Sequence, residues 1–361
     1  MNGKWLRAGC AAGAIAMLAA GCSSAGGSGS GRNASTMSAM NSMSFGPPEK
    51  TTLNVGVVPA MDSAGFFVAL HQGLFAKEGL KINYTPATSS ETAVQEQVGK
   101  NPTLDISAGN YVSYIQQAMK GEPIEAVAEG SIMQQGSQVI FTTPHSGIQS
   151  LSDLKGHTIA VNAPQNIDYL LTVSVLQENG INLKDISFPG GAIAFPNMAS
   201  VLSSGVAKAA TMPEPFASLG EQNGGLQEVA DLDQGATQNF PIEGYVVSKQ
   251  WAAQNPNTLH RFLAALEAGQ EIADTNRDAV EQAFETLKSP QDGQVPPQIA
   301  AVMALNTYPI GLDSTRLQRV SNVMYQFGLE PGRSAPFNVN SMLMPSGSFN
   351  FTPFESSAAS S

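Results

Sequence analysis

Cysteine is almost absent from this chain of 361 residues. The two cysteines, Cys10 and Cys22, both fall within the first 22 residues. The rest of the chain has no cysteine pair for a disulfide, so its stability must come from its core. The chain is long enough to bury most of its apolar surface and longer than a single core usually grows. Two lobes are therefore expected.

Histidines are few, and no hydrolase or nucleotide-binding motif is present. The four histidines are His71, His145, His157 and His260, and their spacing does not match a metal site. Neither a Gly-x-Ser-x-Gly elbow nor a Walker loop occurs. The sequence therefore predicts a protein that is not an enzyme, with no cofactor and no bound metal.

Basic residues are scarce as well. The chain has 18 Lys and Arg against 29 Asp and Glu, a formal net charge of -11. An acidic body argues against a nucleic-acid partner and against a basic membrane-binding surface.

Long hydrophobic runs are also missing. The apolar stretch from Ala8 to Ala20, after Lys4 and Arg7, is too short and small-sided to span a bilayer. It has the features of an export signal, predicted here as residues 1–21. A stretch rich in Ser, Gly, Asn and Met follows, so residues 22–50 are predicted to form a disordered tether.

The end of the signal, Leu18-Ala19-Ala20-Gly21-Cys22, resembles a bacterial lipobox. This resemblance implies that Cys22 is acylated and that the protein is lipid-anchored on the extracytoplasmic side of the membrane. The alternative is an ordinary secreted protein that is cleaved nearby.

From Thr51 onward, short apolar strands alternate with amphipathic helices. This alternation predicts an α/β fold with a largely parallel sheet, and the pattern restarts near residue 143. Most of the chain after Tyr245 is predicted to be helical, with helices that include Pro297 to Leu305 and Asp313 to Phe327. The Ser/Ala tail from Ser356 is predicted to be disordered.

Several segments resemble the nitrate/sulfonate/taurine-type substrate-binding proteins of ABC transporters, over about residues 51–330. The segments that carry the resemblance are Asp62-Ser63-Ala64-Gly65-Phe66-Phe67, Gln72-Gly73-Leu74-Phe75, Asp105-Ile106-Ser107-Ala108-Gly109-Asn110, Ser152-Asp153-Leu154-Lys155-Gly156, Met212-Pro213-Glu214-Pro215-Phe216 and Glu243-Gly244-Tyr245.

The resemblance implies a two-lobed periplasmic binding protein-like fold (type II), in which two α/β lobes are joined by a double-crossover hinge. Residues 51–142 and 245–361 would form lobe 1, and residues 143–244 would form lobe 2. The chain would cross near Thr143-Pro144 and again near Glu243-Gly244. The lobes would close around a ligand by hinge motion.

The function implied is capture of a small polar solute for an ABC importer. The solute would be of the sulfonate/taurine, nitrate or pyrimidine-precursor class. The partners would be permease subunits with their ATPase, and the protein would be a monomer. Two alternatives remain open: a ligand-sensing lobe of a membrane receptor, and a thiamin-pyrimidine synthase-like enzyme. That enzyme class depends on a cysteine-rich motif, which the chain lacks.

In such folds the ligand lies beyond the carboxyl ends of the strands. Six loops are expected there: Pro59 to Ser63, Ala108 to Tyr111, Gly130 to Gln135, Ala163 to Ile167, Phe195 to Met198 and Met212 to Phe216. These loops contain no Lys and no Arg, so backbone N–H groups and helix dipoles would have to hold an anion. Asp62 and Glu214 would instead favour a ligand with an amine or a ring N–H. The candidate ligand-binding residues are Asp62, Ser63, Asn110, Tyr111, Ser131, Gln165, Asn166, Asn197 and Glu214.

Each candidate also has a structural interpretation. Asp62 and Ser63 are most simply helix N-caps, and Glu214 would complement the dipole of its own helix. Asn110 and Asn166 offer a donor and an acceptor together, yet both residue types also form turns.

Overall fold

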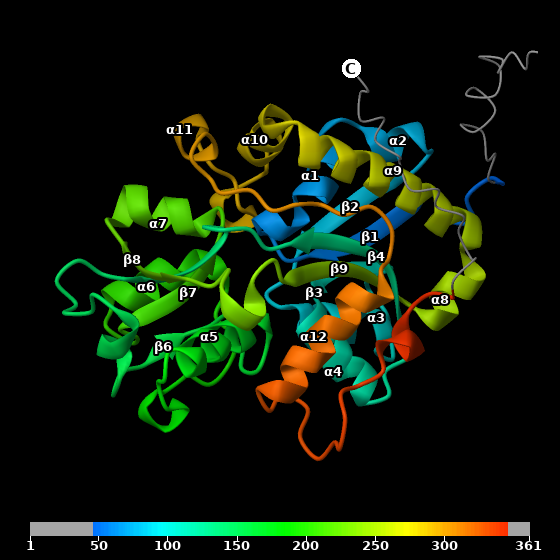
Figure 1. Cartoon of the computed structure of the whole chain (residues 1–361). Coiled ribbons are helices and arrows are strands. Elements are labelled where there is room, and N and C mark those ends of the chain that lie inside the picture. The colour runs from blue at the N-terminus through cyan, green and yellow to red at the C-terminus, as the bar shows by residue number, and fades with distance from the viewer. Residues whose placement is uncertain (1–45, 346–361) are drawn as a thin grey trace, which may run out of the picture. The chain divides into compact units, whose positions relative to one another are not determined.

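The computed structural model describes residues 46–345, which form two mixed β-sheets with helices on their faces (Figure 1). The signal, Cys22 and most of the predicted tether lie outside the described residues. The first sheet, here called sheet A, has the strand order β2-β1-β3-β9-β4. Its strands are β1 (Thr52–Val57), β2 (Lys81–Pro86), β3 (Ile106–Asn110), β4 (Ile124–Ile132) and β9 (Pro241–Ser248).

Both faces of sheet A are buried, as the near-continuous apolar strands require. Along β9, Tyr245 and Val247 pack on one face and Val246 on the other, which follows the two-residue period of a strand. The first face is covered by α1 (Ala64–His71), α2 (Leu74–Lys77), α9 (Pro256–Thr275) and α10 (Arg277–Glu285). The second is covered by α3 (Ser90–Val98), α4 (Tyr111–Met119) and α12 (Ser314–Gln326). The short helices α8 (Lys249–Gln254) and α11 (Pro297–Ala300) follow β9 and α10 along the chain.

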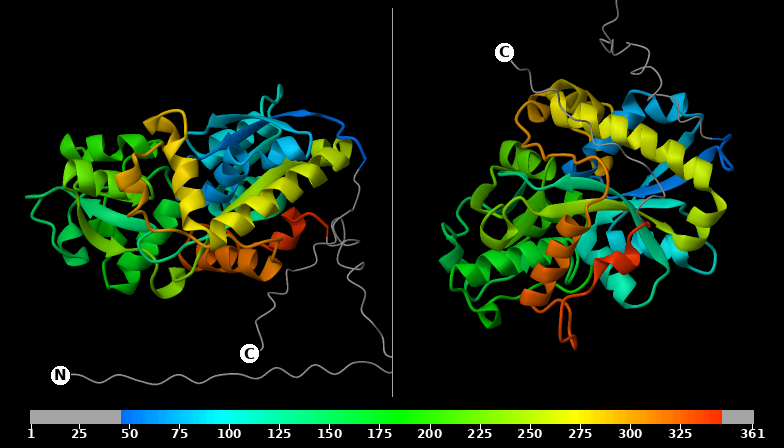
Figure 2. Two further views of the ribbon diagram at one scale, coloured as in Figure 1. Left: turned by 90° about the horizontal axis from the view of Figure 1, so that it is seen from above. Right: turned by 45° about the vertical axis from the view of Figure 1, so that its right-hand side comes forward.

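The second sheet, sheet B, has the order β6-β7-β5-β8. Its strands are β5 (Gln138–Thr142), β6 (Ile159–Ala160), β7 (Ala209–Pro213) and β8 (Gln227–Asp231). Helix α5 (Ile167–Glu178) packs on one face, and α6 (Met198–Ser203) and α7 (Phe216–Gly224) pack on the other. Sheets A and B with their helices form the two lobes of a periplasmic binding protein-like fold, and Figure 2 shows both from two further sides.

In each sheet all strands but one run in the same direction, so the predicted largely parallel arrangement holds except at β9 and β5. Strand β9 runs antiparallel to both β3 and β4, and β5 runs antiparallel to both β7 and β8. These two strands are the ones through which the chain enters sheet B and returns to sheet A.

The two crossings between the lobes lie at residues 133–137 and 232–240. The first crossing was expected near Thr143-Pro144, after β5, but it lies before β5. The reason is that β5 pairs with strands of sheet B and so belongs to the second lobe. The second lies just before Glu243-Gly244, since β9 begins at Pro241. Strand hydropathy could not assign β5 to a sheet, since a buried strand has the same apolar character in either one.

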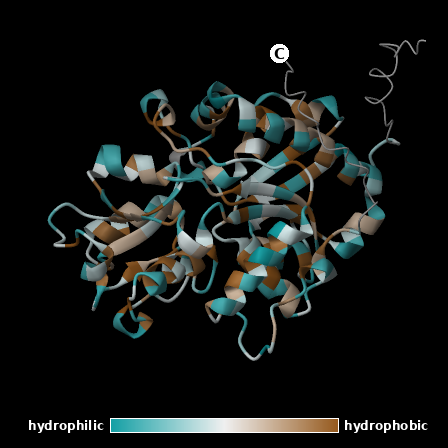
Figure 3. Cartoon of the chain, viewed as in Figure 1, coloured by the Kyte–Doolittle hydropathy of each residue, from teal (hydrophilic) through white to brown (hydrophobic). Residues whose placement is uncertain are grey.

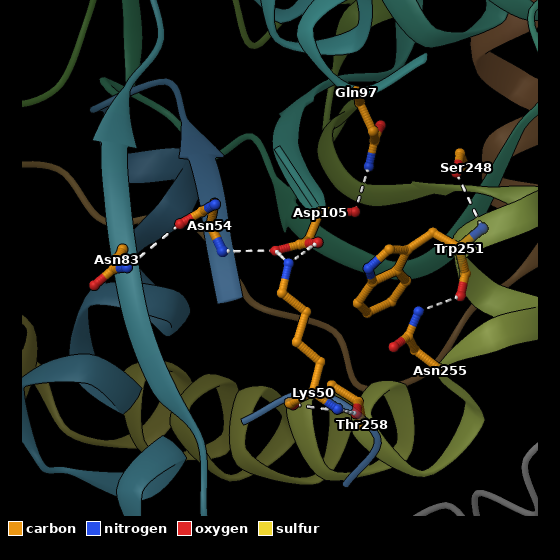
Figure 4. Close-up of polar contacts among 9 residues, drawn as sticks. All are labelled: Lys50, Asn54, Asn83, Gln97, Asp105, Ser248, Trp251, Asn255 and Thr258. Atoms are coloured by element: carbon orange, nitrogen blue, oxygen red, sulfur yellow. Dashed lines mark hydrogen bonds and ion pairs between the residues drawn. The ribbon is translucent and has the colours of Figure 1, made fainter. Parts of the chain in front are cut away.

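Residues 46–50 were predicted as part of the tether but bind to the folded body. The Glu49 carboxylate accepts hydrogen bonds from the backbone N–H groups of Asn257 and Thr258, at 3.2 and 2.9 Å, in the first turn of α9. Lys50 Nζ lies 2.7 Å from Asp105 Oδ1, beside the backbone N–H of Asn54 that donates to the same carboxylate (Figure 4). The end of the predicted tether is therefore a structural element of sheet A's lobe.

The helices carry hydrophobic and hydrophilic residues in alternation along their length, as amphipathic helices do when they pack against a sheet (Figure 3). Among the helices of residues 46–345, none combines the length and apolar character needed to cross a membrane.

Candidate ligand-binding cleft

A small cavity, here called the deep cavity, lies between the two lobes. Its volume is about 20 Å³, room for about one water molecule. Sheet A's lobe contributes the turn after β1, the end of β3 and the start of β9. Sheet B's lobe contributes β5, the N-terminus of α5 and the turn before α6. The lining residues are Val58, Asp62, Ser90, Asn110, Gln138, Asn162, Asn166, Ile167, Asp168, Phe195, Ile242 and Glu243.

The register of β3 and β9 places two of these residues side by side. Asn110 is paired with Glu243, and Gly109 with Gly244. A Cβ atom on Gly244 would lie 2.4 Å from the ring of Tyr111, and one on Gly109 would lie 2.3 Å from Ser90 Oγ. This glycine pair lets Tyr111 and Ser90 pack tightly against the strands that hold the site.

Asp62 is buried in a 3-10 turn, Met61–Ser63, between β1 and α1. Its carboxylate accepts hydrogen bonds from Asn306 Nδ2 at 2.8 Å and from Ser131 Oγ at 3.3 Å. Burial outweighs these bonds and raises the pKa of Asp62 to about 6.

Glu243 is a second buried carboxyl group, carried by β9. It accepts a hydrogen bond of 2.6 Å from Ser63 Oγ. Burial, and then the negative charge of Asp62, raise the pKa of Glu243.

Asp168, in the first turn of α5, brings a third buried carboxyl group from the opposite lobe. Its Oδ2 accepts from the backbone N–H of Asn162 at 3.1 Å, whereas its Oδ1 is buried without a hydrogen-bond partner. Burial raises the pKa of Asp168 to about 7, and the charge of Asp62 acts in the same direction. Asp62, Asp168 and Glu243 are called the cavity carboxyl groups below.

The side-chain amides of the cavity are engaged with the protein. Asn110 caps α4 through Ser113 N and donates to Ser90 Oγ at 2.8 Å. Asn166 caps α5 through Tyr169 N and donates to Asn162 Oδ1 at 3.3 Å. Both asparagines therefore fix helix N-termini at the cavity and line it at the same time.

A wider pocket of about 190 Å³, the outer pocket, shares Val58 and Phe195 with the deep cavity. It is mostly apolar, and Phe195 is held there by stacking on Phe216 with ring centroids 5.9 Å apart. The outer pocket is lined by Val58, Pro59, Pro86, Ala87, Thr88, Ala194, Phe195, Pro196, Asn197 and Gln291.

Hydrogen bonds join the lobes directly on both sides of the cavity. The backbone carbonyl of Glu214 accepts a hydrogen bond of 2.7 Å from the backbone N–H of Met61. The Glu214 carboxylate accepts one of 3.1 Å from the backbone N–H of Ala304. Gln116 Nε2 donates to the carbonyl of Gln165 at 2.8 Å.

Three of the nine residues predicted from sequence line the deep cavity: Asp62, Asn110 and Asn166. Asn197 lines the outer pocket. Ser63 and Ser131 do not line the deep cavity, but each donates a hydrogen bond to a carboxyl group that does.

The other three predicted residues lie elsewhere. Tyr111 is fully buried against Gly244. Gln165 is exposed and contributes its carbonyl to the bridge between the lobes. Glu214 is turned toward Ser218, which donates to it through both its backbone N–H and its hydroxyl.

The interpretation of Asp62 and Ser63 as N-caps is wrong. Ser63 stands at the N-cap position of α1, but its side chain makes no capping bond because its hydroxyl donates to Glu243. Asp62 instead accepts from side chains of three distant segments, Ser131, Gln138 and Asn306.

Sequence reasoning missed Asp168, Glu243, Gln138 and Asn162. A usable signal existed for two of them. Asp168 stands among apolar residues at the start of α5, and Glu243 stands within the buried strand β9. A carboxyl group inside an apolar run is costly to bury, which marks it as a candidate for function.

Comparison with known proteins gives a family match. A family model described as "NMT1/THI5 like" matches residues 60–279, more than half of the chain. That range includes all three cavity carboxyl groups.

The chain is 25% identical over 231 residues to the riboflavin-binding protein RibY of Chloroflexus aurantiacus. The alignment covers 63% of this chain and 62% of RibY, so the chain spans less than two thirds of that relative's length.

Two solved structures share the fold. The alkanesulfonate-binding protein SsuA of Xanthomonas axonopodis pv. citri, bound to MOPS, has a TM-score of 0.66 at 16% identity, covering 82% of this chain and 99% of SsuA. The periplasmic nitrate-binding protein NrtA of Synechocystis PCC 6803 has a TM-score of 0.66 at 15% identity, covering 80% and 84%. At these identities the likeness establishes the fold alone.

Proposed function

Because the chain belongs to the NMT1/THI5-like family, we propose that it is the solute-binding component of an ABC-type importer. It captures a small polar solute between its lobes and delivers it to permease subunits with their ATPase. The observation that carries this proposal is the deep cavity, whose polar lining comes from both lobes.

Capture follows from the way the cleft is built. The deep cavity and outer pocket are small compared with the ~300–1,000 Å³ of typical ligand sites. The lobes therefore separate to admit the solute and close over it. The crossings at residues 133–137 and 232–240 are the segments that absorb this motion.

The relatives suggest which solutes to test first. RibY is named for riboflavin, SsuA for alkanesulfonates and NrtA for nitrate. Riboflavin is neutral and carries N–H and O–H donors that suit buried acceptors. Nitrate and sulfonates are anions, and the lining residues of the deep cavity and outer pocket include no Lys, Arg or His to hold them.

The experiment is a thermal-shift panel on the full chain with riboflavin, alkanesulfonates, taurine, nitrate and aminopyrimidines. A solute at about 100 times its dissociation constant adds roughly 2.7 kcal/mol to the free energy of unfolding. The proposal expects a saturable shift from a solute that is recovered unchanged. A solute converted into product would favour the enzyme alternative, and a folded protein that binds no solute, including any retained from its source cells, would contradict the proposal.

For location, we propose lipid anchoring through Cys22 on the extracytoplasmic side, with the protein acting as a monomer. The support is the lipobox-like segment. Incorporation of radiolabelled palmitate should occur in the natural chain and disappear in Cys22→Ser. Equal labelling of both would contradict anchoring at this residue.

A further inference from the structure

All the ionisable side chains that line the deep cavity are acidic. Asp62 and Glu243 face it from sheet A's lobe, and Asp168 faces it from sheet B's lobe. Its lining includes no Lys, Arg or His. Arg316, on α12, forms a two-pronged ion pair with Glu129 at 2.8 and 3.0 Å, and neither residue lines the cavity.

The free hydrogen-bonding capacity of the cavity is on acceptor atoms. Asp168 Oδ1 and Gln138 Oε1 are buried without partners, in side chains that are 0% and 1% exposed. Meanwhile Gln138, Asn110 and Asn166 each donate from their amide nitrogen to a protein atom. A solute that donates hydrogen bonds would satisfy these acceptors, whereas one that only accepts would leave them unpaired.

Like charges enclosed together are unfavourable unless an opposite charge joins them. Asp62 disfavours ionisation of both Asp168 and Glu243. A cation enclosed among them would offset this repulsion and the cost of burying the carboxylates. An anion would add a further negative charge in the same small space.

We infer that the solute carries a protonated nitrogen group, such as an ammonium or amidinium, which Asp168 binds directly and whose charge the nearby carboxyl groups of Asp62 and Glu243 stabilise. The inference rests on the proposed function, because it assigns the ligand of the same cleft. The body of the solute extends into the outer pocket beside Phe195, which both spaces share. No group of three or more His, Cys, Asp or Glu within residues 46–345 is arranged to hold a metal ion, which favours an organic cation over a metal ion.

The test uses three probes of similar shape and different charge: benzylamine, benzyl alcohol and benzenesulfonate. Each is titrated into the full chain, and affinity is taken from the thermal shift and from calorimetry. The inference expects benzylamine to bind at least about tenfold more tightly than either other probe, as expected for hydrogen bonds to charged groups. Binding should strengthen as the pH rises and the cavity carboxyl groups ionise. The titratable groups that act on them are the three carboxyl groups themselves and the buried tyrosines, of which Tyr308 faces Asp62 and Glu243, and Tyr111, Tyr114 and Tyr245 face Glu243.

Asp168→Asn should weaken benzylamine binding about tenfold or more, and Glu243→Gln serves as a second variant should the first not fold. Asp278→Asn, on the exposed first turn of α10, is the matched control and should bind like the natural chain. Preference for benzenesulfonate or benzyl alcohol, or undiminished benzylamine binding in folded Asp168→Asn, would overturn the inference.

The outcomes separate this inference from the proposed function. Tight binding of an anionic or neutral solute, with no preference for amines, would refute the inference and leave solute capture standing. Absence of any bound solute would contradict both. Equal stabilisation by calcium or magnesium chloride would show a metal-type cation site and refute the organic cation.

Discussion

At the scale of single residues, burial raises the pKa of all three cavity carboxyl groups, and it leaves Asp168 partly protonated near neutral pH. An isolated aspartate has a pKa near 3.8, but Asp168 reaches about 7 and Asp62 about 6. At a pH between the pKa of such a group in the unfolded chain and its higher pKa in the folded protein, the folded protein binds more protons than the unfolded chain. The free energy of unfolding contributed by these groups therefore decreases as the pH rises from about 4 to about 7.

Asp168→Asn tests this cost of ionisation. The variant should increase the free energy of unfolding above pH 7 by an amount on the order of a few kcal/mol, because no buried charge forms. Below about pH 4 the two proteins should be equally stable, since Asp168 is then neutral in both states. Urea unfolding across this pH range measures the difference, and an unchanged pH profile would contradict the account.

Gly244→Ala tests the tight packing behind the cavity. The added Cβ would meet the Tyr111 ring at 2.4 Å, so the free energy of unfolding should fall by about 1–3 kcal/mol. Gly224→Ala is the control, since its Cβ would lie 3.7 Å from Leu226, an ordinary contact. Denaturant titration of both variants measures the effect, and equal stabilities would argue against the packing role.

The sequence predicted part of the site, and the reason differs by residue. Asn110 and Asn166 could be found because each follows a strand and begins a helix, a local pattern. Glu243 could not be placed at the cavity, because its position depends on the antiparallel pairing of β3 with β9. Gln138 was missed for a similar reason, since it reaches Asp62 only through the crossing of the chain between lobes.

At the scale of secondary-structure elements, α9 begins at Pro256 with its free N–H groups satisfied from outside the helix. Asn255, at the N-cap position, makes no side-chain capping bond. The Glu49 carboxylate accepts from Asn257 and Thr258 instead, and although burial opposes it, these bonds lower the pKa of Glu49 to about 2. A negative charge is also favoured there by the helix dipole.

Glu49→Ala should therefore lower the free energy of unfolding by about 1 kcal/mol, because α9 loses its cap. The loss should diminish as the pH falls toward about 2, where Glu49 becomes protonated in the natural chain. Glu96→Ala on the exposed face of α3 is the control. An equal effect of both changes on the thermal midpoint would show that Glu49 has no special role.

Element prediction succeeded where the pattern is local. Helix α12 was expected over Asp313 to Phe327 and spans Ser314–Gln326, with the Asp313 side chain as its cap. Helix α11 was expected to reach Leu305 but ends at Ala300. The following residues serve the cleft instead, because Ala304 donates to Glu214 and Asn306 donates to Asp62.

At the scale of the whole molecule, the lobes meet through hydrogen bonds around a nearly filled cavity and through apolar packing, since one core cluster includes Ile115 of α4 and Leu170 of α5. The side chains of Glu214 and Gln116 each contribute to this contact. Each such bond contributes about 1 kcal/mol, so the loss of these bonds should favour open arrangements, although the apolar packing between the lobes opposes opening.

A double change, Gln116→Ala with Glu214→Ala, should shift the solute-free protein toward open arrangements. Small-angle scattering should then show a larger radius of gyration than in the natural chain, and a bound solute should reduce the difference. Gln95→Ala is the control, because Gln95 bonds to Gln117 within the same lobe. No change in scattering would contradict the role of these contacts in closure.

The central claim is that a solute binds between the lobes at the cavity carboxyl groups. Native mass spectrometry of the full chain, purified gently from its source cells, tests it most directly. The account predicts a complex with one solute molecule of defined mass, lost in the Asp62→Asn and Asp168→Asn double variant and retained in Asp278→Asn. A complex that persists undiminished in the folded double variant, or a folded protein that never carries a solute, would contradict it.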